Sequence, residues 1–183
     1  MFVAQEKKKG NIAEYLLYMW QVEDLIRANN FDVDSIYTNF ISRFSLPENQ
    51  RIEIKTWYSN LAQMMIEENI RKSGHLQFLT NQLNDLIEFH HTIVNNKRDR
   101  EYIEIYANTR AIIAEYSIKT NLTLLPEIEV CFIALYSTLL LKLQKKQISK
   151  DTLEGTEAFS RLLAMLSKKY HLFEQGKISF EDL

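Results

Sequence analysis

The sequence predicts an all-α fold, a single-domain bundle of six or seven helices. Glycine and proline are rare, with four and two copies in 183 residues, so long helices are favoured over a many-turned β fold. A hydrophobic content of 46% and a charged content of 25% are typical of a globular chain. Apolar residues also recur at helical spacing along most of the sequence.

The helices are expected in a regular order and are separated by short turns. They span residues 11–28, 32–44, 48–72, 75–95, 99–120, 126–147 and 149–175, and 177–183 is expected to be a tail. The chain shows no internal repeat and no linker long enough to divide it, so residues 1–183 are expected to form one domain.

Each of the first three helices has an apolar stripe and a start or stop signal. In the first, the stripe is formed by Ile12, Leu16, Met19, Trp20 and Ile26. The second begins at Asp32, a suitable N-cap. The residues expected to face the core are Val33, Ile36, Tyr37, Phe40, Ile41 and Phe44. A capping box from Ser45 to Glu48 starts the third, which the pair Ser73-Gly74 ends.

The later helices are bounded by polar turns and capping residues. A polar turn at residues 95–98 separates the fourth helix from the fifth. Pro126 suits the first turn of the sixth helix. Ser149 or Asp151 caps the seventh, and Gly176 stops it.

The segment 126–147 is expected to be the central helix of the bundle. It carries no charge between Val130 and Leu141, and its apolar residues point in nearly every direction around the axis. A helix that is apolar all round is a buried helix. Small residues gather on one of its sides, and Gly155 lies in the apolar stripe of the seventh helix, so that helix is expected to pack there.

Two carboxylates occur where an apolar residue would be expected. Glu23 lies on the stripe of the first helix and Glu68 on that of the third. A carboxylate removed from water needs a partner, and Arg27 or Arg110 is expected to supply it. One interpretation is a polar pocket formed by these four residues. The other is an ion pair that sets the packing of the helices, or an acid at a helix end that reaches solvent.

Other candidate sites have plain structural explanations. The spacing of Glu88 and His91 matches that of helical di-iron sites, but it occurs once, whereas those proteins need two copies. We therefore expect a surface pair, a satisfied core histidine at His90, and neither a metal nor a cofactor. The many aromatic residues suggest either a ligand cleft or the rim of the core. The single cysteine, Cys131, is expected in the core.

The charge pattern limits the partners. The net charge of −2 and short basic clusters, such as Lys97-Arg98 with Arg100, do not form the basic stripe of a nucleic-acid-binding protein. The longest apolar run is shorter than the roughly 20 residues that span a membrane. Glu14 interrupts the apolar stretch after Lys7–Lys9, which argues against a signal peptide and for the cytoplasm.

The N-terminal block resembles a known bacterial family. Residues 2–7, 11–15 and 18–24 carry the similarity, which extends over the whole chain. The chain is identified as a member of the family called domain of unknown function 4924. The resemblance implies a single all-helical domain, and it implies no activity and no site residues.

Two functions are therefore expected as alternatives. The first is a non-enzymatic interaction or scaffolding protein that forms a homo-oligomer such as a dimer, or that binds another protein. Its basis is surplus apolar surface on the third helix, at Ile52, Ile66 and Ile70. The second is a small-molecule-binding or enzymatic bundle with the polar pocket near Glu23 and Glu68. No catalytic motif is present in the sequence, which favours the first alternative.

Overall fold

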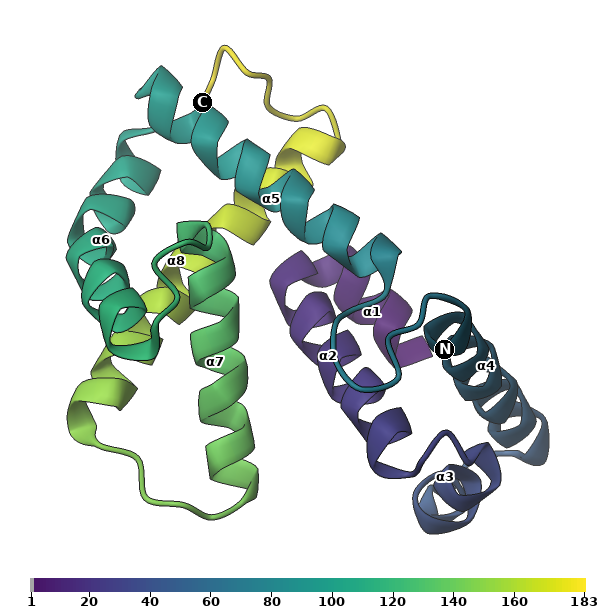
Figure 1. Ribbon diagram of the computed structural model, residues 1–183. Coiled ribbons are helices and arrows are strands. Elements are labelled where there is room, and N and C mark those ends of the chain that lie inside the picture. The colour runs from purple at the N-terminus through teal and green to yellow at the C-terminus, as the bar shows by residue number, and fades with distance from the viewer. Residues whose placement is uncertain (1) are drawn as a thin grey trace. The chain divides into compact units, whose positions relative to one another are not determined.

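The protein is all-helical, as the sequence predicts (Figure 1). The computed structural model describes residues 2–183, with the backbone alone described for Phe2. The helices in this part of the chain are α1 (Phe2–Gly10), α2 (Ile12–Ala28), α3 (Val33–Asn39), the 3₁₀ helix η1 (Ile41–Arg43), α4 (Glu48–Glu67), α5 (Gln77–Asn96), α6 (Arg100–Thr120), α7 (Glu127–Leu143) and α8 (Lys150–Glu174).

The contacts divide the chain into two compact units. The first comprises α1 up to Lys9 and residues Glu14–Gln82, and the second comprises Gly10–Ala13 and Leu83–Leu183. Helix α5 begins in the first unit and continues into the second. The expectation of one domain over residues 1–183 stays a prediction.

The first unit follows the predicted capping signals in part. Asp32 caps α3, because its side chain accepts hydrogen bonds from the backbone N–H groups of Asp34 and Ser35. The predicted capping box at Ser45 is wrong, since α4 has Pro47 at its N-cap and no side-chain cap. Helix α1 begins before the predicted first helix. The core includes Leu16, Met19, Ile26, Ile36 and Met65.

The second predicted helix is shorter than expected. Helix α3 ends at Asn39, and only one turn of 3₁₀ helix follows it. Because the helix ends there, the residues after Asn39 do not continue the apolar stripe of α3. Phe40 and Phe44 were therefore wrongly predicted as core residues, because they are 44% and 60% exposed.

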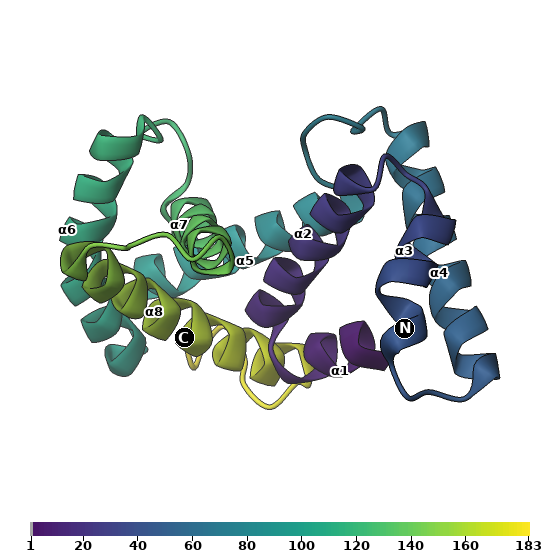
Figure 2. The same cartoon turned by 90° about the horizontal axis from the view of Figure 1, so that it is seen from below.

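In the second unit, α8 packs against both α6 and α7, and α6 also packs against α7. Figures 1 and 2 show α8 crossing these two helices. Ser149 caps α8, as predicted. Asp99 caps α6 and Asn121 ends it in the left-handed conformation, although neither role was predicted. The central position that the sequence assigns to the 126–147 helix is thus shared between α7 and α8.

The predicted burial of α7 holds for its first half. Its buried residues are Ile128, Val130, Cys131, Phe132, Ala134 and Thr138. Further along, Leu139 and Leu140 are half-buried and Leu143 is exposed. The expected packing of the seventh helix against the 126–147 helix is confirmed, since α8 packs against α7, although Gly155 itself lies next to Ile112 of α6.

The predicted tail packs back onto the second unit. Residues after Gly176 return to the end of α5, and the Leu183 side chain is only 1% exposed (Figures 1 and 2). Hydrogen bonds and an aromatic contact, described below, hold this segment. The segment is therefore part of the packed structure of the unit.

Candidate functional site

The predicted residue Glu23 is fully buried in the first unit. Its Oε2 lies 2.5 Å from Nδ1 of His75, and its Oε1 accepts a hydrogen bond of 2.8 Å from the backbone N–H of Leu76. The His75 ring stacks on Trp20, with 4.2 Å between the ring centroids. The partner of Glu23 is therefore His75, and the expectation that Arg27 or Arg110 would pair with it is wrong.

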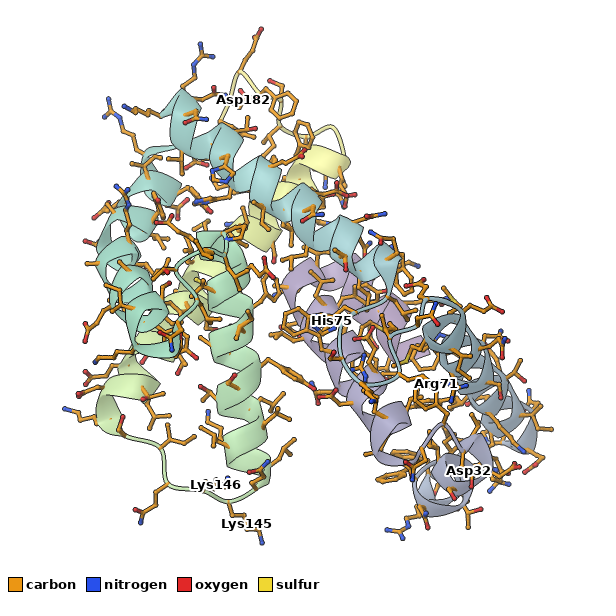
Figure 3. The ribbon with its side chains drawn as sticks, in the orientation of Figure 1. Asp32, Arg71, His75, Lys145, Lys146 and Asp182 are labelled. Atoms are coloured by element: carbon orange, nitrogen blue, oxygen red, sulfur yellow. The ribbon has the colours of Figure 1, made fainter. Side chains whose placement is uncertain are left out.

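Arg27 binds the loop that leads from α4 to α5. Its guanidinium donates to the backbone carbonyls of Ile70 and Gly74 and also pairs with Asp24 at 3.0 Å. Gly74 has a φ of +94°, which a residue with a side chain rarely adopts. Together with Glu23 and His75, this arginine fastens the loop to α2. Figure 3 labels His75 in this loop.

The other two predicted residues have different surroundings. Glu68 is exposed, and its Oε2 accepts a hydrogen bond of 2.7 Å from the backbone N–H of Gln77, the first residue of α5. Arg110 belongs to the second unit, where it lies 3.5 Å from Glu127. The structure thus gathers Glu23, Arg27 and Glu68 around one loop and does not place Arg110 in the same unit.

A second polar cluster joins α5, α6 and α7. His90 is buried, and its Nδ1 lies 2.7 Å from the Tyr102 hydroxyl. Its Nε2 is 3.9 Å from Glu127, which accepts a hydrogen bond from the Tyr106 hydroxyl. The prediction of a satisfied core histidine is confirmed, whereas Tyr102 and Tyr106 were not singled out as its partners.

The ionisation of this cluster is set by burial. Burial, and then the nearby charge of His91, lower the pKa of His90 to about 4, so its ring is neutral at pH 7. Burial and Glu127 raise the pKa of Tyr106 to about 12, and burial raises that of Tyr102 as well. A neutral imidazole between protonated tyrosines is suited to hold three helices together.

Glu88 and His91, the predicted surface pair, are both exposed on α5. Within residues 2–183, no group of three or more His, Cys, Asp and Glu side chains is arranged to hold a metal ion.

The same part of the chain contains no helix with the length and apolar character needed to cross a membrane. Cys131 is buried in α7, as predicted, and burial raises the pKa of its thiol.

An apolar pocket opens on the first unit, where sequence reasoning expected core. Its volume is about 430 Å³, within the range of binding pockets. We use the name apolar pocket for the cavity lined by Val3, Phe40, Ile41, Phe44, Leu46, Gln50, Ile54 and Tyr58. The helix break after Asn39 creates it, since a continuous α3 would have carried both phenylalanines along one stripe.

The described residues form an all-helical protein with two polar clusters, around the buried side chains of Glu23 and His90, and an open apolar pocket. The chain matches the family model described as Domain of unknown function (DUF4924) over residues 1–177, and it belongs to this family. No curated protein and no solved structure matches it.

Proposed function

We propose that this protein is a non-enzymatic interaction module that self-associates through the apolar pocket. The observation that carries the proposal is the pocket of about 430 Å³ beside Phe44, whose side chain is 60% exposed. Large apolar side chains at the rim of a cavity are typical of surfaces that another molecule covers.

The occupant that fits best is a second copy of the chain. Phe40 and Phe44 line the pocket and are 44% and 60% exposed, so one surface carries both the cavity and large apolar groups that a partner can contact. A two-fold axis lets the same surface of two copies pair with itself, because each contact is made twice. Each Phe44 ring would then enter the pocket of the other copy.

The charges next to the pocket favour this pairing. Arg51 pairs with Glu48 at 2.5 Å, and Lys55 pairs with Asp34 at the same distance. Arg51 and Lys55 directly follow the pocket residues Gln50 and Ile54 in α4. Charges of both signs are thus balanced locally, and two copies of the surface can meet without like charges facing each other.

The alternative of a small-molecule site near Glu23 and Glu68 has less support. Glu23 is engaged by His75 and a backbone N–H, and Glu68 by the N–H of Gln77. These contacts hold the loop between α4 and α5. The polar atoms of the predicted pocket are therefore used within the protein, which favours the interaction role.

The proposal is tested by measuring mass against concentration with light scattering or sedimentation velocity. We expect wild type to dimerise and Phe44→Asp to weaken dimerisation by roughly a hundred- to ten-thousand-fold, because the dimer loses two buried Phe side chains that contribute about 1.5–3 kcal/mol each. Leu124→Asp is the matched control, since Leu124 is 97% exposed in the second unit and should leave dimerisation unchanged. A wild-type monomer at all concentrations would overturn the proposal.

We place this activity in the bacterial cytoplasm as part of the same proposal. The resemblance of residues 2–24 to a bacterial family supports the bacterial source. The interruption of the first apolar stretch by Glu14 supports a chain that is not exported. Localisation of a tagged copy by cell fractionation would test the placement.

A further inference from the structure

The segment 178–183 packs against the end of α5 and the turn that follows it, within the second unit. Three of its backbone carbonyls accept hydrogen bonds from the end of α5 and the turn that follows. The Asn96 side chain donates to Phe180 at 3.2 Å, the Arg98 guanidinium donates to Glu181 at 2.8 Å, and the Arg98 backbone N–H donates to Leu183 at 3.3 Å. The main chain of the segment is thus recognised at three of its last four residues.

Two apolar side chains anchor the segment. The Phe180 ring lies on Phe173 of α8, with 4.4 Å between the centroids, and Phe173 lies in turn on Phe89 of α5. Leu183 is buried. A phenylalanine that is 51% exposed and, three positions later, a buried leucine therefore contact the surface, and the two residues between them are acidic.

Charge complementarity accompanies these contacts. Asp182 lies beside the end of α5, where the basic residues of the α5–α6 turn begin (Figure 3). Glu181 is next to it, with its backbone carbonyl bonded to Arg98. In the basic cluster at residues 97–100, Arg98 donates to the backbone carbonyl of Glu181, and its charge also acts on the Asp182 carboxylate. Ser179 holds Asp182 through its backbone N–H and its hydroxyl, and these hydrogen bonds, with a smaller effect of Arg98, lower the pKa of Asp182.

We propose that Asn96, Arg98 and Phe173 form a peptide-binding site that recognises a segment of the pattern Phe-acidic-acidic-Leu, and that residues 178–183 occupy it as a built-in competitor. The partner is an acidic segment of another protein with this pattern. Such a segment binds when it displaces the chain's own copy, which is present at the high effective concentration of a tethered ligand.

The test uses a chain that ends at Lys177 and a fluorescent peptide with the sequence of residues 177–183. Fluorescence anisotropy should show saturable binding to the shortened chain and at least tenfold weaker binding to the full chain, where the tethered copy competes. Replacing the phenylalanine and leucine of the peptide by alanine should abolish binding. Raising the salt concentration should weaken it, because exposed charges are screened.

Matched variants of the shortened chain distinguish the effect of the Arg98 hydrogen bonds from the effect of losing one positive charge. Arg98→Ala should weaken peptide binding at least tenfold. Arg100→Ala removes the same charge from a neighbouring position and none of the hydrogen bonds described above, so its effect should be smaller. Equal effects of the two substitutions, or no binding to a shortened chain with unchanged helicity, would overturn the proposal.

A second route applies if the shortened chain does not fold. The double variant Phe180→Ala, Leu183→Ala of the full chain should release the segment, which would show as faster hydrogen exchange at the Arg98 amide. This variant should then bind the wild-type peptide. Release of the segment without peptide binding would also overturn the proposal.

Discussion

The two units each bury a titratable side chain, but they stabilise it in opposite ways. In the first, Glu23 is met by the His75 imidazole, which can carry the opposite charge, and by a backbone N–H. In the second, His90 faces the Tyr102 hydroxyl, and burial keeps its ring neutral at pH 7. One cluster can hold an ion pair, whereas the other is a network of neutral groups.

The difference reflects what each cluster holds. The Glu23 cluster fastens an irregular loop whose backbone groups lack helical partners, so a carboxylate is a useful acceptor there. The His90 cluster lies between regular helices whose backbone groups are already bonded, so it only needs to satisfy its own side chains. Three predictions test this comparison, and the largest expected effect comes first.

Glu23→Leu should destabilise the first unit by about 3–5 kcal/mol, because it leaves the His75 ring and the Leu76 N–H without their acceptor. Urea unfolding followed by Trp20 fluorescence would measure the loss, since Trp20 stacks on His75. Glu14→Gln on the exposed side of α2 is the control and should cost under about 1 kcal/mol. Unfolding of Glu23→Leu at the wild-type urea concentration would contradict the comparison.

The second unit should lose stability as the pH falls from about 6.5 to about 4. The unfolded chain takes up a proton at the ordinary histidine pKa of 6.5, whereas folded His90 does so only near its lowered pKa of about 4. The contribution of His90 is complete above pH 6.5 and amounts to about 3 kcal/mol. Unfolding free energies at pH 7.5 and 4.5 would measure it.

Two neighbouring histidines make this measurement specific. His90→Gln should flatten the pH dependence in this window. His91→Gln should keep most of it, because burial lowers the pKa of His90 more than the charge of the exposed His91 does. The other titratable groups around His90, which are Tyr102, Tyr106, Cys131 and Glu127, stay in place in both variants. The same slope in both variants would show that His90 is not the source.

Tyr102→Phe should have the smallest effect, a loss of about 1–3 kcal/mol, because it leaves Nδ1 of the buried His90 without a partner. Tyr106→Phe is the matched control. It removes a hydroxyl bonded to the partly exposed Glu127, which water can solvate, so it should cost less. Thermal unfolding of both variants would rank them, and a larger loss for Tyr106→Phe would reverse the expected role of the two tyrosines.

Local sequence signals predicted much of the fold. Asp32 and Ser149 cap helices as predicted, and the predicted helix over 99–120 matches α6, which begins at Arg100 and ends at Thr120. These features act over a few residues, so a single sequence is sufficient to recognise them. The all-helical class and the buried first half of α7 follow from the same local patterns.

Only the tertiary structure decided which residues meet. Glu23 and His75 are 52 residues apart in the sequence, and no local pattern around His75 marks it as the partner of a carboxylate. The end of α3 at Asn39, which places Phe40 and Phe44 at the apolar pocket, likewise depends on packing against α4. Helical spacing determines which side chains share a face, but the chain's long-range contacts determine whether that face is covered.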